Sequence, residues 1–150
     1  MALVGFIGLC LLVGAAAGSV TGTSVGSWYL TLARPSGTPP NWVFGVVWTA
    51  LYIMIGTAAW LVWRQPGHRQ ALRLWGWQLL VNAAWTPAFF GLRSPALALV
   101  VIVPLLGLIG LVARAFWRLS RPAALLLVPY ALWSIYATYL TVGFWWLNRE

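Results

Sequence analysis

Acidic side chains are almost absent from this chain of 150 residues. It contains no aspartate, no lysine and a single glutamate, Glu150, at the last position. A pair of carboxylates for general acid–base catalysis is therefore missing, and so is the lysine of a phosphate-binding loop. Ion-coupled transport usually depends on an ionisable side chain within the membrane, so the sequence also argues against a proton-coupled pump.

Cysteine and histidine are nearly as rare. Cys10 is the only cysteine, which rules out a disulfide within the chain, and we interpret it as a small buried apolar residue. His68 is the only histidine and lies in an arginine-rich stretch with no second metal-ligating residue nearby. We therefore expect no metal site and no resident cofactor.

Apolar and aromatic side chains fill the composition instead. Hydrophobic residues make up 62% of the chain, and twelve residues are tryptophan. A water-soluble domain of this length cannot bury that much apolar surface, so we predict an integral membrane protein. Its unusual content is aromatic and not ionisable, which favours the binding of a large, flat, apolar molecule over acid–base chemistry.

Nine arginines give the chain a formal charge of +8. They lie between hydrophobic runs, where they mark membrane boundaries and contact anionic headgroups. The expected charged partner is therefore the lipid bilayer, and we expect no nucleic acid.

Five segments are apolar over roughly the 20 residues that a membrane-spanning helix needs. A helical bundle also satisfies the backbone hydrogen bonds that lipid cannot. We predict an all-α membrane protein, a single five-helix domain over 1–150. The first segment carries no charge, so we interpret it as a retained helix and not a signal peptide. The predicted helices are 3–23, 42–63, 72–91, 96–117 and 122–147.

The loop between the first two helices, 24–41, has an unusual composition. It contains Trp28, Tyr29 and three prolines, so it reads as neither a flexible linker nor a helix. We expect an ordered lid folded onto the mouth of the bundle. The alternative is an interfacial aromatic belt, which Trp and Tyr commonly form.

Arginines are distributed unequally between the two ends of the predicted bundle. Six fall in or near the second and fourth links, on the side of the N-terminus, and three fall on the opposite side. This bias predicts a multi-pass membrane protein with its N-terminus in the cytoplasm. It is modest, and leaves a dual or inverted orientation open, as well as the identity of the membrane.

Polar and aromatic side chains share single helix faces. Gln78, Asn82 and Trp85 lie at i, i+4 and i+7 of the third predicted helix. Amides inside a membrane either pair between helices or contact a ligand, and the spacing does not decide between the two.

Two further helices carry aromatic faces. The second has Phe44, Trp48 and Tyr52 in line, and the fifth has Tyr130, Trp133 and Ala137. Should these faces converge with the amides, they would enclose an aromatic-walled cavity with a few polar groups, as in a small-molecule site.

Small residues repeat along the first helix as Gly14, Gly18 and Gly22. This spacing favours close helix contact. The contact is either with another helix of the same bundle or with a second copy of the chain.

Motifs along nearly the whole chain resemble one family. They are Trp28-Tyr29-x-x-Leu32-x-Arg34-Pro35, Pro39-Pro40-Asn41-Trp42-Val43-Phe44, Val47-Trp48-Thr49-x-Leu51-Tyr52, Gln78-x-x-x-Asn82-x-x-Trp85, Phe89-Phe90, Pro129-Tyr130-x-x-Trp133 and Leu147-Asn148. The chain resembles the tryptophan-rich sensory protein / translocator protein family (TspO/MBR, once called peripheral benzodiazepine receptors), as a bacterial member.

The resemblance implies a five-helix bundle, often a homodimer, with a ligand cavity beneath the first loop. It implies a membrane receptor, sensor or carrier for porphyrins such as protoporphyrin IX and haem, with sterols and isoquinoline carboxamides as further ligands. The family's pocket carries over to eight positions, to which the face analysis adds Tyr52 and Gln78. The eight are Tyr29, Pro39, Phe44, Trp48, Asn82, Phe89, Trp133 and Ala137.

An enzymatic alternative follows from the same resemblance. Some bacterial members are reported to degrade protoporphyrin in light, and the two tryptophans implicated match Trp48 and Trp133. These are the only candidate catalytic residues, and the sequence leaves open whether the protein is an enzyme.

Two positions depart from the family pattern. Gly37 stands where many relatives have a lid tryptophan. Late in the fifth helix, Trp146 stands where a basic residue completes the family's cholesterol-recognition pattern, which argues against tight sterol binding.

Overall fold

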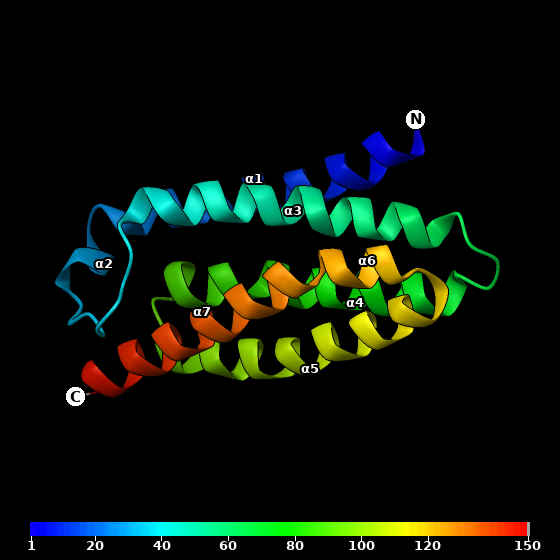
Figure 1. The fold of residues 1–150 in the computed structure, drawn as a ribbon. Coiled ribbons are helices and arrows are strands. Elements are labelled where there is room, and N and C mark those ends of the chain that lie inside the picture. Colours follow the sequence, from blue (N-terminus) through cyan, green and yellow to red (C-terminus); the bar gives the residue numbers. More distant parts are fainter. Residues whose placement is uncertain (150) are drawn as a thin grey trace.

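The computed structural model describes residues 1–149, and every regular element in that range is helical (Figure 1). In chain order the elements are α1 (Ala2–Val25), α2 (Trp28–Thr31), α3 (Asn41–Trp63), α4 (Arg69–Thr86), the π-helix η1 (Pro87–Gly91), α5 (Pro95–Leu119), α6 (Arg121–Leu126) and α7 (Val128–Leu147).

Four helical stretches are long and apolar enough to cross a membrane: Ala2–Val25, Asn41–Trp63, Pro95–Leu119 and the combined Arg121–Leu147. A span needs roughly 20 mostly apolar residues, so this is an integral membrane protein of the all-α class. The α4 helix has a suitable length, but its arginines and amides lower its mean hydropathy, and it is not among the four.

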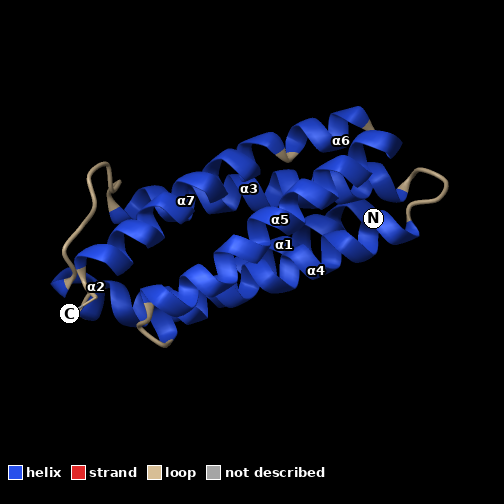
Figure 2. Ribbon diagram, turned by 90° about the horizontal axis from the view of Figure 1, so that it is seen from below, coloured by secondary structure: helices blue, strands red, loops and turns tan. Residues whose placement is uncertain are grey.

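The long helices lie side by side. α1 packs against α3, α4 against α5, and α5 against α7. Figures 1 and 2 both show α2 and the C-terminal end of the described chain at one end of the bundle, and the N-terminus at the other. Residues 64–68, between α3 and α4, turn at the same end as the N-terminus.

Two glycines allow α1 and α3 to touch. A Cβ atom added at Gly56 would lie 2.7 Å from Cα of Ile7, and one added at Gly14 would lie 2.7 Å from the ring of Tyr52. Glycine permits such approach because it has no side chain. The close contact expected of the glycine stripe therefore holds at Gly14, but a Cβ at Gly18 or Gly22 would meet no atom within 4 Å.

Prolines interrupt two of the helices that the sequence predicts as continuous. At Pro87 the helix widens into η1, where the amide of Leu92 donates to the carbonyl of Pro87 at 2.8 Å. Near Pro129 the helix breaks at Leu127, between α6 and α7. Proline lacks the amide hydrogen that would bond one turn earlier, so the backbone changes its pattern at both places.

The segment 26–40, which we call the loop segment, contains the single helical turn α2, which the sequence analysis did not predict. Side chains of α7 hold the segment. Asn148 accepts from the amide of Ala33 at 2.9 Å and donates to its carbonyl at 3.0 Å, and Tyr139 donates to the carbonyl of Ser36 at 2.9 Å. Tyr136 donates in the same way to the carbonyl of Gly37.

Candidate ligand-binding cavity

A cavity of about 640 Å³ lies between the helices at the end that carries the loop segment. Its lining comes from α1, α3, α4, η1, α5 and α7, with Tyr29 contributed by α2. Small-molecule sites in proteins are usually apolar hollows of about 300–1,000 Å³ with few polar groups. The volume and the lining both fit that description.

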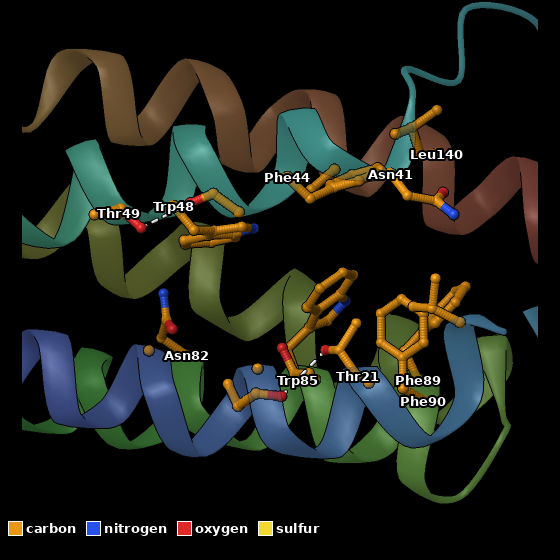
Figure 3. A pocket seen from close by; sticks show the side chains of 18 of the residues that line it. Thr21, Asn41, Phe44, Trp48, Thr49, Asn82, Trp85, Phe89, Phe90 and Leu140 are labelled. Carbon is orange, nitrogen blue, oxygen red and sulfur yellow. Dashed lines mark hydrogen bonds between the residues drawn. The ribbon is translucent and has the colours of Figure 1, made fainter.

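Aromatic rings form two facing walls. Phe44 and Trp48 project from α3, one turn apart, and face Trp85 and Phe89 across the cavity (Figure 3). Trp85 stacks on Phe89 with ring centroids 5.7 Å apart and an interplanar angle of 27°. Phe90 completes the second wall from η1. Such faces stack well on a flat conjugated ring.

The middle of the α1 wall consists mostly of small residues, between Leu11 at one end and Val25 at the other. Gly14, Gly18 and Gly22 line the cavity together with Ala15 and Thr21. The sequence analysis found this glycine stripe and interpreted it as a helix contact. A stripe of small residues either brings helices together or leaves space beside them, and its spacing is the same in both cases.

A hydrogen-bonded chain joins three helices at the inner end of the cavity. Tyr52 donates to Oδ1 of Asn82 at 2.8 Å, Nδ2 of Asn82 donates to the Tyr130 hydroxyl at 2.7 Å, and that hydroxyl donates to Oε1 of Gln78 at 2.9 Å. All four side chains are buried. These hydrogen bonds fix α3, α4 and α7 relative to one another, because breaking them leaves buried polar groups without partners.

The predicted site residues divide into two groups. Seven line the cavity: Tyr29, Phe44, Trp48, Tyr52, Asn82, Phe89 and Ala137. Three do not. Gln78 lies behind Asn82 in the hydrogen-bonded chain, Trp133 packs edge-on against Phe44 with centroids 5.9 Å apart, and Pro39 lies half-buried in the loop segment.

Tyr29 closes the loop end of the cavity. It is 2% exposed, and its ring packs against Phe89, Phe90 and Phe144 at 5.4 to 6.4 Å. The guanidinium of Arg34 lies 5.0 Å from the centre of the same ring. Burial raises the pKa of the Tyr29 phenol, and the positive charge of Arg34 opposes that rise. Tyr29 therefore stays neutral and packs as an aromatic side chain.

The lining is mainly apolar and aromatic, with uncharged polar groups among it. Within residues 1–149, no group of three or more His, Cys, Asp or Glu side chains comes together. The lining offers aromatic faces for stacking, two amides and several hydroxyl side chains. The amides are Asn41 and Asn82, and the aliphatic hydroxyls are those of Thr21, Thr49, Thr86, Ser134 and Thr141. These groups can stack on a ligand and hydrogen-bond to it.

Comparisons with known proteins identify the family of this chain. The chain matches the TspO/MBR family over residues 6–147. It is 44% identical over 146 residues to the tryptophan-rich protein TspO of Chlorobaculum tepidum, covering 95% of this chain and 92% of that protein. It is 40% identical to the tryptophan-rich sensory protein of Cereibacter sphaeroides over 74% of this chain and 70% of the relative.

A mammalian protein is also similar. The translocator protein of Homo sapiens is 38% identical over 123 residues, which cover 79% of this chain and 73% of that protein. Together with the match over nearly the full length, these identities place the chain: it belongs to the TspO/MBR family.

Proposed function

We propose that this protein is a membrane receptor, sensor or carrier that binds porphyrins and related flat apolar ligands in the cavity beneath the loop segment. The observation that carries the proposal is the cavity itself, with a volume of about 640 Å³ and tryptophan and phenylalanine rings on facing walls. Stacking on both faces of one planar ring system is the interaction that this arrangement favours.

The polar groups limit the ligand further. Asn82 borders the cavity, and one hydrogen of its amide is already donated to Tyr130. The amide has a second hydrogen to donate, so a ligand with an acceptor atom on an otherwise apolar body fits best. Protoporphyrin IX and haem have that chemistry, and isoquinoline carboxamides share it.

We further propose that the helical stretch of α4 and η1 is a fifth membrane crossing. It runs from Arg69 to Gly91, long enough at about 1.5 Å per residue to cross the hydrocarbon core. Its amides Gln78 and Asn82 are buried against neighbouring helices. They therefore avoid the free-energy cost of exposing a polar side chain to lipid. Five crossings place the two ends on opposite sides of a bacterial membrane. The homodimer implied by the family resemblance remains a prediction.

The test is a titration of purified protein in detergent with protoporphyrin IX in the dark, followed by tryptophan fluorescence. Trp48→Phe should weaken binding, because Trp48 borders the cavity. The matched control is Trp77→Phe, since Trp77 is 62% exposed on α4 and away from the cavity. An absence of saturable binding by the unaltered protein would overturn the proposal.

Illumination of the same samples separates binding from catalysis. A binding protein holds the pigment without consuming it, so the porphyrin absorbance should fall no faster than in detergent alone. Pigment loss that requires Trp48 or Trp133 would instead favour the light-dependent enzyme.

A further inference from the structure

The structure contains buried polar atoms that no protein group satisfies. Within residues 1–149 there are five, and two of them belong to residues that border the cavity: Oγ of Ser134 and Nε1 of Trp85. Native proteins leave few buried polar atoms unpaired, and each exception calls for an explanation. In a membrane the cost of such an atom is not relieved by surrounding lipid.

Ser134 differs from its neighbours on the same helix. The hydroxyls of Thr138 and Thr141 donate to backbone carbonyls one turn earlier, at 2.8 and 2.7 Å. That local bond is the usual way for a hydroxyl to be satisfied inside a helix. Ser134 is 1% exposed and makes no such bond. Its hydroxyl is therefore available for a partner that the helix does not supply.

Ser134 borders the cavity, with its hydroxyl oxygen covered by protein atoms in this structure. Ser134 lies one turn before Ala137 on α7, and both residues border the cavity. Its side chain is one carbon and one hydroxyl, so a single rotation about χ1 redirects the hydroxyl without moving the backbone.

The hydrogen-bonding groups near Ser134 indicate which kind of ligand atom would bond to its hydroxyl. Trp85 offers only a donor, and Oδ1 of Asn82 already accepts from Tyr52. Among residues 1–149 no carboxylate side chain is present. The hydroxyl hydrogen of Thr141 is already donated to the carbonyl of Ala137. The Ser134 hydroxyl and the Trp85 indole are thus unpaired donors of residues that border the cavity, and a ligand acceptor is the group complementary to them.

We propose that Ser134 is a specificity-determining residue of the cavity, donating a hydrogen bond to a carbonyl or ring-nitrogen acceptor on a flat, conjugated ligand. The inference rests on the proposed function, because it assigns the polar preference of the same cavity. It adds a residue on α7 that selects an acceptor-bearing ring over a hydrocarbon ring of the same shape.

The experiment uses two probes of nearly identical shape, anthraquinone with two carbonyl acceptors and anthracene with none. Their affinities are measured in the same detergent for the unaltered protein and for Ser134→Ala. Loss of one hydrogen bond should reduce the preference for anthraquinone roughly three- to tenfold, with little change for anthracene. The thermal stability of the ligand-free variant should stay the same or rise, because a buried unsatisfied hydroxyl is removed.

Two further variants sharpen the result. Ser134→Cys retains a weak donor, so its preference for anthraquinone should lie between those of the unaltered protein and Ser134→Ala. Thr138→Val removes a hydroxyl that is satisfied within α7 and does not border the cavity, so its preference should match that of the unaltered protein.

The outcomes separate this inference from the proposed function. Saturable protoporphyrin IX binding together with an anthraquinone preference that Ser134→Ala leaves intact would overturn the role of Ser134 alone. A loss of thermal stability in Ser134→Ala with unchanged preference would show that the hydroxyl serves packing, and would overturn it as well. If the unaltered protein binds neither porphyrin nor either probe, both proposals fail.

Discussion

The helices α1 and α3 meet in two different ways along their length. Near the N-terminal end, Gly56 of α3 lies so close to Ile7 of α1 that an added Cβ would be 2.7 Å from backbone. Toward the loop segment the same helices border the cavity, and an added Cβ at Gly18 or Gly45 would meet no atom within 4 Å. Gly56 thus lets the two helices pack closely at one end, whereas Gly18 and Gly45 leave space between them at the other.

This contrast separates stability from binding along one pair of helices. The packed end tolerates no added volume because the neighbouring atoms are backbone, which cannot rotate away. The cavity end has room for added volume, which would displace a ligand and leave the helices where they are. A substitution that adds volume at the packed end should therefore lower the stability of the protein. One that adds volume at the cavity end should leave stability unchanged and weaken ligand binding.

The largest effect on folding is expected for Gly56→Ala. The added methyl must push α1 away from α3, at a cost of about 1–3 kcal/mol in the free energy of unfolding, and the melting temperature in detergent should fall accordingly. Gly107→Ala on α5 is the control, because an added Cβ there meets nothing within 4 Å. Equal melting temperatures for the two variants would contradict the tight contact.

Asn82→Ala should reduce both stability and binding. The change removes the partner of the Tyr52 hydroxyl and a donor to Tyr130, and buried groups left unpaired cost about 1–3 kcal/mol. Protoporphyrin IX affinity should fall in the same variant, because Asn82 borders the cavity. Unchanged melting would mean that the buried chain of hydrogen bonds contributes nothing to holding the helices.

Gly18→Leu should affect binding without loss of stability. The leucine enters open space beside α1, so the melting temperature should not fall, while the smaller cavity should weaken protoporphyrin IX binding at least severalfold. Gly107→Leu, which adds the same side chain away from the cavity, should bind as the unaltered protein does. A Gly18→Leu protein with full affinity would show that the ligand does not occupy the α1 side.

The smallest effect is expected for Asn148→Ala. This change removes two solvent-exposed hydrogen bonds to Ala33 and one to the carbonyl of Phe144. Water can replace the exposed bonds, so their net contribution to stability is small. The melting temperature should change little, but amide hydrogen exchange in residues 27–38 should accelerate while α5 is unaffected. Unaltered exchange would mean that the tyrosine contacts alone hold the loop segment.

Sequence reasoning identified the helices and much of the cavity wall for the same reason. Apolar runs of roughly 20 residues and the spacing of Phe44, Trp48 and Tyr52 are both local properties of a helix, and they can be read without knowing the neighbours. That Asn82 and Ala137 would share a pocket was implied by the family resemblance, since spacing alone left the convergence of their faces open, and both border the cavity.

Other features depend on contacts that spacing does not encode. Gln78 and Asn82 share a helix face and both bond to the Tyr130 hydroxyl, yet only Asn82, one turn nearer η1, borders the cavity. Pro104 stays within a continuous helix, whereas Pro87 and Pro129 mark changes in helix type or continuity. The tight contact at Gly56 had no repeat to signal it.

The bonds between Asn148 and Ala33 join positions 115 residues apart in the chain. Contacts of such long sequence separation form late, since the intervening chain must be ordered first. During synthesis, α1 and α3 can pair and Tyr29 can pack on Phe89 and Phe90 before the ribosome has made α7, but the hydrogen bonds from Tyr136, Tyr139 and Asn148 to the loop segment must wait for it. The cavity wall is therefore completed only when α7 joins the helices made before it, so the hollow and the loop that covers it take their final form late in folding.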